Sequence, residues 1–234
     1  MIYPDLYNCN IAVIGLGYVG LPLAMEFAER KTCNFTGNKM SRNVVGYDSK
    51  LSRIKDLKNN IDKTGEKSAD ELKNKTNIIF TNNPSDILLS DIFIVAVPTP
   101  INKKKKPNLK FLETASLLIG ETLSSRKSKF IPIIIFESTV YPGATEEFCV
   151  PIIENSSGLS YHKDFLCAYS PERMNPGDKT KKLIDIVKIT SGCNITCSKW
   201  VDEFYRSIID AGTYMASSIK VAEAAKVIEN TQRD

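Results

Sequence analysis

The sequence is poor in histidine and has no long apolar run. Its only histidine is His162, which excludes a site built from several imidazoles. The longest apolar stretches, such as IFIVAV (92–97) and IPIIIF (131–136), are strand-sized and far too short to cross a bilayer. The first residues also lack the basic segment, apolar segment and small-residue cleavage site of a secretory signal. We therefore expect a cytoplasmic protein that is not associated with membranes.

The six cysteines lack the spacing of a disulfide framework or a zinc site. Cys193 and Cys197 are spaced CxxxC, but the single histidine lies well away from them in the sequence. In a reducing compartment such residues are free thiols, and several are expected to be buried as small apolar side chains. We expect no metal site.

Positive charge is not concentrated into a binding surface. The formal net charge of +4 comes mostly from scattered lysines, with one dense run at Lys103–Lys106. A nucleic-acid-binding domain more often shows a basic stripe with interleaved aromatic residues. We interpret the run as a solvated loop and expect no nucleic-acid partner.

The chain does contain a regular alternation of apolar runs and amphipathic segments. Unbroken apolar runs are typical of strands covered on both faces, and strand–helix alternation predicts a doubly wound, mostly parallel α/β sheet. The expected strands cover residues 11–15, 44–47, 77–81, 92–97, 131–136, 166–169, 186–190 and 213–216. The expected helices cover residues 18–30, 49–58, 68–75, 109–124, 143–155, 196–210 and 218–234.

The first strand runs directly into GLGYVG, which carries glycines in GxGxxG spacing. Gly15 permits a tight turn, Gly17 lets the backbone approach a pyrophosphate, and Gly20 permits close packing of helix on strand. The phosphates would lie at the positive end of the following helix, beside Tyr18 and Val19. The strand–turn–helix context predicts a Rossmann-like dinucleotide site, and a Gly-rich turn without a ligand is the alternative.

An acidic residue at the end of the second strand supports this interpretation. Asp48 is placed to bond the ribose hydroxyls of adenosine and to repel a 2′-phosphate, which favours NAD over NADP. It lies 28 residues after Gly20, whereas about 20 is usual. We assign the excess to a polar surface loop at 30–42. Alternatively, Asp48 is the N-cap of the helix expected at 49–58.

The loop VPTP (97–100) follows the fourth strand, at the edge of the sheet where open α/β sheets bind ligands. Pro98 and Thr99 are therefore candidate cofactor contacts. A rigid strand exit is the alternative.

Three more stretches make the interpretation specific: FESTVYPGATEEFCVPIIE (136–154), CAYSPERMNPGDK (167–179) and AGTYMASSIKVAEAAKVIENTQRD (211–234). Together with IAVIGLGYVGLPLA and VAVPTPI, they resemble the UDP-glucose/GDP-mannose dehydrogenase family. Within it, the sequence is most similar to the 6-dehydrogenases of UDP-N-acetylhexosamines (UDP-GlcNAc, UDP-GalNAc, UDP-ManNAc) in polysaccharide biosynthesis. The resemblance covers essentially the whole chain.

The resemblance implies oxidation of the C6 alcohol of a UDP-sugar to a carboxylate, with reduction of two NAD. It implies an aldehyde, then a thiohemiacetal and a thioester on a cysteine, and finally hydrolysis by water. It also implies that the full-length protein is a homodimer.

Several site residues are implied by the same resemblance. Glu172 in SPER corresponds to the glutamate of thioester hydrolysis, Thr139 to the threonine that positions the water, and Ser138 to a neighbour of the nicotinamide. Without the resemblance, Glu172 would be a solvated turn residue. Ser138 and Thr139 would cap the helix that follows them.

On the last predicted helix, Lys226 and Asn230 correspond to the residues that stabilise the C6 oxyanion. Their i, i+4 spacing places them on one helix face. The alternative is an ordinary surface helix on which Lys226 pairs with Glu223 or Glu229. Arg53 corresponds to a cofactor-contacting arginine, or else lies on a solvated helix face.

Two departures from the family qualify these expectations. A second glutamate of the UDP-glucose enzymes is replaced by Pro176, which is similar to the acetamido-sugar branch. The family's GGHC segment with its nucleophilic cysteine has no counterpart here. We expect an NAD-binding domain at 1–215 and the start of a central dimerisation helix at 216–234, without the UDP-binding domain.

The isolated chain is therefore expected to lack full activity. One alternative is a short, non-catalytic NAD-binding or regulatory module of the same fold. Another Rossmann enzyme, such as a hydroxyacid dehydrogenase or a methyltransferase, is disfavoured because His162 is poorly placed for catalysis.

Overall fold

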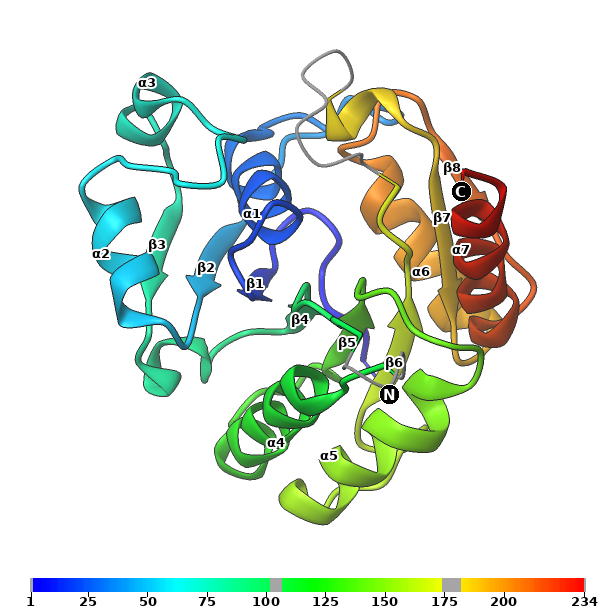
Figure 1. Ribbon diagram of the computed structural model, residues 1–234. Helices are drawn as coiled ribbons and strands as arrows, with labels where there is room; N and C mark the ends of the chain where they lie inside the picture. The colour runs from blue at the N-terminus through cyan, green and yellow to red at the C-terminus, as the bar shows by residue number, and fades with distance from the viewer. Residues whose placement is uncertain (1, 102–106, 174–181, 234) are drawn as a thin grey trace.

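The computed structural model describes residues 2–101, 107–173 and 182–233, without the side chains of Asn230 and Arg233. In this part of the chain eight strands form one sheet, in the order β3-β2-β1-β4-β5-β6-β7-β8 (Figure 1). Neighbouring strands are parallel except β6 and β7, which are antiparallel. The predicted mostly parallel α/β sheet is confirmed. The strands are β1 (Asn10–Ile14), β2 (Asn43–Tyr47), β3 (Ile78–Thr81), β4 (Ile92–Val95), β5 (Ile133–Phe136), β6 (Leu166–Tyr169), β7 (Lys188–Gly192) and β8 (Thr213–Met215).

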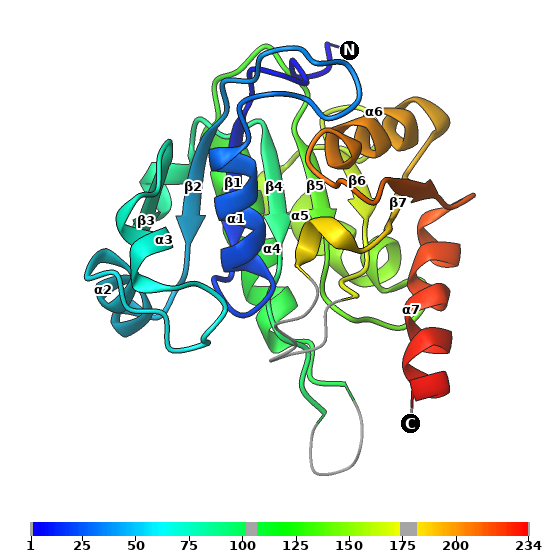
Figure 2. The same cartoon turned by 90° about the horizontal axis from the view of Figure 1, so that it is seen from above.

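Helices cover both faces of the sheet. Along β1, Ile11 and Val13 pack on the side of α1 and α6, whereas Ala12 and Ile14 pack on the side of α4, α5 and α7. Figure 2 shows α1 in front of β1 on one side of the sheet. Because both faces are covered, the central strands β1, β4, β5 and β6 are buried along almost their whole length and show no alternation of apolar and polar residues. The α-helices are α1 (Gly20–Glu29), α2 (Leu51–Lys58), α3 (Ala69–Lys73), α4 (Lys110–Ser125), α5 (Val150–Ser157), α6 (Ile195–Arg206) and α7 (Ile219–Arg233).

Within the described ranges, short helical turns also occur between these elements: the 3₁₀ turns η1 (Pro84–Ile87) and η3 (Leu183–Asp185), and the π-helical turn η2 (Thr145–Cys149). The helix predicted at 143–155 is thus a π-helical turn followed by α5. No helix in the described ranges is long and apolar enough to cross a membrane.

The strand predicted at 186–190 is observed two residues later in the chain, as β7. Its position is set by antiparallel pairing with β6, which aligns Tyr169 with Ser191 and Ala168 with Gly192. The apolar run identifies the strand, but its boundaries depend on the pairing with β6 and are less well defined by the local sequence.

The segment 30–42 is only partly the surface loop that we predicted. Cys33 is buried, and Arg42 is 1% exposed. The Arg42 guanidinium lies 5.5 Å from the ring centre of Phe27 and 4.9 Å from that of Phe204. It also donates hydrogen bonds to the Leu6 carbonyl, so the base of the loop packs against α1 and α6. The polar composition of the loop concealed this anchor.

Helix α7 packs on the edge of the domain next to β6 and β7. Ile219 and Ala222 are buried in the apolar layer that also contains α4 and α5. The division of the chain into 1–215 and 216–234 stays a prediction.

Candidate functional site

The turn between β1 and α1 has the geometry of a phosphate-binding loop. Gly15 has a φ of +92°, and a Cβ there would lie 2.8 Å from the Ala96 carbonyl oxygen. A Cβ on Gly20 would lie 1.8 Å from the Gly15 carbonyl oxygen. A Cβ on Gly17, in contrast, would have no neighbour within 4 Å. Packing within the chain therefore requires the first and third glycines, and the second faces open space where a ligand can approach.

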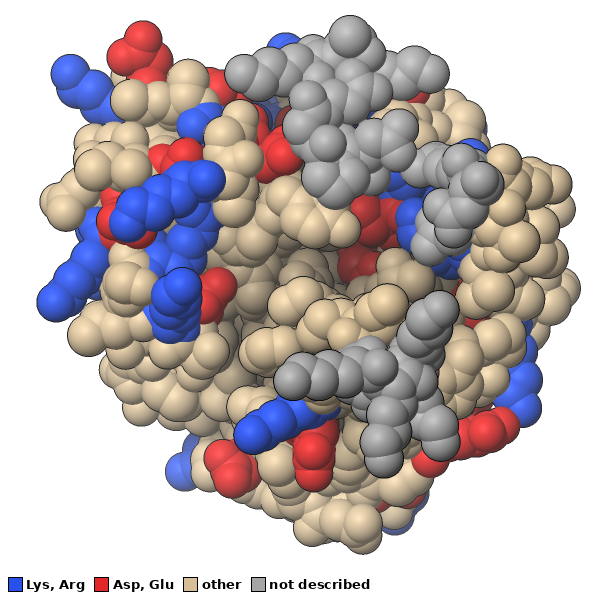
Figure 3. All heavy atoms as spheres, in the orientation of Figure 1, with Lys and Arg blue, Asp and Glu red and all other residues tan. Residues whose placement is uncertain are grey.

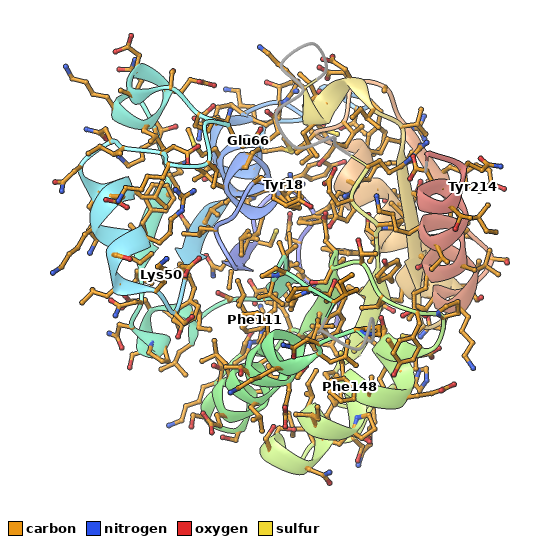
Figure 4. The ribbon with its side chains drawn as sticks, in the orientation of Figure 1. Tyr18, Lys50, Glu66, Phe111, Phe148 and Tyr214 are labelled. Carbon is orange, nitrogen blue, oxygen red and sulfur yellow. The ribbon has the colours of Figure 1, made fainter. Side chains whose placement is uncertain are left out.

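A cavity of about 760 Å³ opens beside this turn. It is lined by Gly15 and Gly17 from the turn, by Asp48 and Arg53 after β2, and by Pro98 after β4. Figure 3 shows this face of the molecule hollowed near its centre, with Lys and Arg atoms gathered over α2 beside the hollow. In Figure 4, Phe111 at the start of α4 borders the same region.

The cavity lies where the strand order reverses. Strand β1 has β2 on one side and β4 on the other, because the chain adds β2 and β3 on one side and then crosses over to place β4 on the other. Open α/β sheets bind ligands at this point, outside the carboxyl ends of the strands.

Asp48 ties the glycine turn to the end of β2. Its Oδ2 accepts the N–H of Leu16 at 2.9 Å, and its Oδ1 accepts the N–H of Lys50 at 2.9 Å. The capping alternative is wrong, because the N-cap of α2 is Lys50 and not Asp48. A carboxylate has about four acceptor positions, so Asp48 can still accept ribose hydroxyls from the cavity.

Arg53 is 9% exposed and hydrogen-bonds to the same turn. Its Nε donates to the Leu16 carbonyl at 2.8 Å, and its Nη1 contacts Asp62 at 2.7 Å. Its Nη2 is buried without a hydrogen-bond partner among the described residues. An unsatisfied donor beside the cavity fits a polar ligand. The solvated-face alternative is therefore wrong.

The loops after β4 and β5 are joined by hydroxyl hydrogen bonds. Ser138 Oγ donates to the Val97 carbonyl at 2.6 Å, and Thr99 Oγ1 donates to the Thr139 carbonyl at 2.6 Å. No described side chain caps η2, so the prediction that Ser138 and Thr139 cap this helix is wrong. The Thr139 side chain is exposed at the edge of the sheet.

Glu172 lies at the same edge, after β6, and is 5% exposed. It is therefore not a solvated turn residue. Its Oε2 lies 3.7 Å from Nζ of Lys188. The pKa of Tyr18, in the glycine turn, is raised first by burial and then by the charge of Glu172. Figure 4 shows Tyr18 over the middle of this face.

Lys226 on α7 is 6% exposed and lies 3.8 Å from Oε2 of Glu229. Glu229 also accepts a hydrogen bond from Nε of Arg173 at 3.1 Å. Arg173 of the SPER loop and Lys226 of α7 thus both contact the carboxylate of Glu229. Of the two predicted partners of Lys226, Glu229 is confirmed, whereas Glu223 turns toward the backbone after β5. The side chain of Asn230 and the position of Pro176 lie outside the described residues.

The glycine turn, the cavity at the switch point and the order of the motifs agree with one comparison. The family model described as UDP-glucose/GDP-mannose dehydrogenase family, NAD binding domain, matches residues 9–209. The chain belongs to this family. NAD is therefore confirmed as the cofactor, and the glycine turn, Asp48 and Arg53 fit it.

Relatives in the family are similar along almost the whole chain. It is 52% identical to a UDP-N-acetyl-D-glucosamine 6-dehydrogenase of Pseudomonas aeruginosa, over 97% of this chain and 50% of the relative. It is 50% identical to the enzyme of the same name from Salmonella typhi, over 96% of this chain and 49% of that one. The chain spans about half the length of the curated relatives it matches.

Solved structures agree with the fold. The UDP-D-ManNAc dehydrogenase of Pyrococcus horikoshii matches with a TM-score of 0.79 and 31% identity, covering 96% of this chain and 50% of that chain.

The sequence did not single out Glu137 or Lys188, which the structure places beneath Glu172. Nζ of Lys188 lies 2.6 Å from Oε2 of Glu137, and both residues are buried. Tyr205 on α6 donates a hydrogen bond to the other oxygen of Glu137. Burial raises the pKa of Glu137, and the charge of Lys188 opposes this rise. The one available signal was a lysine inside the apolar run IVKIT.

Proposed function

We propose that the native polypeptide containing this chain oxidises the C6 alcohol of a UDP-N-acetylhexosamine to the carboxylate, using two NAD. The observation that carries the proposal is the contact between the SPER loop and α7, where Glu229 binds both Arg173 and Lys226. The glycine turn follows β1 at the same edge of the sheet, because β1 and β6 run in the same direction. The named activities of the relatives that are half identical to the chain support the same substrate class.

The cofactor site uses groups that the chain already orients. The backbone beside Gly17 and the N-terminus of α1 would receive the pyrophosphate, because helix N-termini favour anions. Asp48 would accept the ribose hydroxyls, and the unsatisfied Nη2 of Arg53 would donate to the nucleotide. Val19, Pro98, Thr99 and Ser138 would complete the wall toward the nicotinamide. When bound, NAD supplies the hydride acceptor.

The substrate side uses the SPER loop and α7. Glu172 would accept a proton from the water that attacks the acyl carbon, and Thr139 would position this water. Lys226 and Asn230 would face the oxygen at C6, where negative charge develops during oxidation and hydrolysis. The buried position of Lys226 strengthens its field at that oxygen.

We further propose that α7 begins the central helix of a homodimer. Val221, Val227 and Ile228 on this helix are 49%, 41% and 59% exposed, which suits contact with a partner. The six free thiols fit a reducing, cytoplasmic compartment.

The test measures NAD binding and turnover separately. The 234-residue chain is expected to bind NAD in a calorimetric titration and to show no sustained NADH formation with UDP-GlcNAc. The native polypeptide that contains the chain is expected to form NADH with a UDP-N-acetylhexosamine. Binding of NAD without turnover by that native polypeptide would instead support a non-catalytic module.

A further inference from the structure

A buried cluster of charged groups lies next to Glu172 and has no role in the reaction as described above. Glu137 follows β5, Lys188 begins β7, and Tyr205 belongs to α6; they are 1%, 3% and 0% exposed. Nζ of Lys188 lies 2.6 Å from Oε2 of Glu137 and 3.7 Å from Oε2 of Glu172. One ammonium group therefore stands between two carboxylates from different segments.

The position of Lys188 is tightly determined. Besides Glu137, its Nζ lies 3.4 Å from the Pro171 carbonyl and 5.3 Å from the ring centre of Tyr205. The Tyr205 hydroxyl occupies the second oxygen of Glu137. The pair Glu137–Lys188 is thus fixed on all sides, and Lys188 has little freedom to follow Glu172 if that residue moves.

Burying the Glu137–Lys188 ion pair removes both charges from water, which costs solvation free energy. An ion pair taken out of water commonly gives no more stability than apolar side chains of the same volume. The space between β5, β7 and α6 could be filled by apolar residues like those around it. The cluster instead places the positive charge of Lys188 next to Glu172 of the SPER loop.

We infer that Lys188 is a positioning residue for Glu172, and that Glu137 determines how strongly the charge of Lys188 acts on Glu172. This inference rests on the proposed function, in which Glu172 accepts a proton from water. Lys188 holds the Glu172 carboxylate in place, because opposite charges 3.7 Å apart attract each other. Glu137 acts in the opposite direction, since it draws the same ammonium group toward itself.

Other titratable groups face the cluster from α6, the glycine turn and α7. From α6, Tyr205 has a pKa raised well above its usual value by burial and by Glu137. From the glycine turn, Tyr18 also has a raised pKa, caused first by burial. From α7, Lys226 contacts Glu229, which also binds Arg173 of the SPER loop. The charges that two substitutions can change independently are those of Glu137 and Lys188.

The two substitutions are expected to shift the pH dependence of catalysis in opposite directions. Lys188→Met removes the cation beside the Glu172 carboxylate, so the acid limb of the kcat profile moves to higher pH. Glu137→Gln leaves the whole charge of Lys188 to Glu172, so the acid limb moves down. A purely structural role predicts lower activity in both variants without opposite shifts.

The experiment uses the native polypeptide with UDP-GlcNAc and NAD. Profiles of kcat from pH 5 to 9 are compared for the wild type, Glu137→Gln, Lys188→Met and the double variant Glu137→Gln/Lys188→Met. The double variant removes both members of the buried Glu137–Lys188 pair, so it tests the loss of Lys188 even if the single variant fails to fold; its acid limb is expected to move up as in Lys188→Met. Lys199→Met removes the same charge from an exposed site on α6 and serves as the matched control. NAD affinity and thermal unfolding are measured for every variant.

Opposite shifts, with NAD affinity within about twofold of the wild type, would establish the role of Lys188. Profiles that stay at the wild-type position, or that move in the same direction in both variants, would overturn the inference and leave the proposed function intact. Absence of UDP-sugar-dependent NADH formation by the wild type would overturn the proposed function itself, and with it any role of Lys188 in that reaction.

Discussion

Glu223 of α7 holds the backbone of Gly143 in the turn that follows β5. Its Oε2 accepts the Gly143 N–H at 2.5 Å, and its Oε1 accepts the Thr145 N–H at 2.9 Å. Glu223 is fully buried, so this carboxylate fastens α7 to the loop that carries Ser138 and Thr139. The helix that presents Lys226 is thereby fixed relative to the sheet edge.

Substitution of Glu223 tests this fastening. Glu223→Ala leaves two buried N–H groups unsatisfied, so we expect the free energy of unfolding to fall by ~2–4 kcal/mol. Glu223→Gln keeps one acceptor oxygen and is expected to lose about half as much. Urea denaturation followed by circular dichroism measures both, with the exposed Glu203→Gln on α6 as the control. Equal stability of Glu223→Ala and the wild type would contradict the fastening.

The glycine turn offers a matched pair of substitutions. Gly20→Ala would place a methyl group 1.8 Å from the Gly15 carbonyl, so the turn must distort and Tm must fall. Gly17→Ala meets no atom of the chain within 4 Å, so its Tm should stay within about 2 °C of the wild type.

The same Gly17→Ala variant is expected to bind NAD at least ~10-fold more weakly, because the methyl group occupies the path of the pyrophosphate. Calorimetric titration of NAD into both variants gives the comparison. Wild-type affinity in Gly17→Ala would show that the pyrophosphate lies elsewhere.

Asp48 is expected to discriminate between the two nicotinamide dinucleotides. Its carboxylate repels a 2′-phosphate, and Asp48→Asn removes this charge while keeping an acceptor for the Leu16 N–H. We expect the ratio of NADP to NAD affinity to rise by ~10-fold or more in this variant. Competition binding at fixed ionic strength measures the ratio. An unchanged ratio would mean that Asp48 serves only the turn.

Cys193 is expected to be the most reactive thiol of the chain. It is half-buried, whereas the other five cysteines are buried. A hydrogen bond from the Cys197 thiol holds the pKa of Cys193 below its usual range, although burial acts against this. The rate of alkylation by iodoacetamide rises with the fraction of thiolate. For Cys193 it should therefore level off at a lower pH than for a free cysteine, whose pKa is about 8.5. Peptide mapping identifies the modified residue, and Cys193→Ser is the control. Faster labelling of another cysteine would refute the prediction.

Sequence patterns predicted the parts of the molecule that depend on neighbours in the chain. The strand–glycine–helix unit around Gly15 was correct because its packing is local, and the apolar runs were correct because both sheet faces are covered. Partners far apart in sequence were not predictable. Glu137 and Lys188 are 51 residues apart, and Arg42 binds Ser207 across 165 residues. Such contacts follow from topology, which local periodicity does not encode.

The reversed direction of β7 decides which of its residues reaches the ligand edge of the sheet. A parallel strand brings its last residue to that edge, so a parallel β7 would have presented Gly192 there. Because β7 is antiparallel to β6, its first residue, Lys188, lies beyond the end of β6 and opposite Glu172. One change of strand polarity in an otherwise parallel sheet thus supplies a cation where strand ends would otherwise offer only loops.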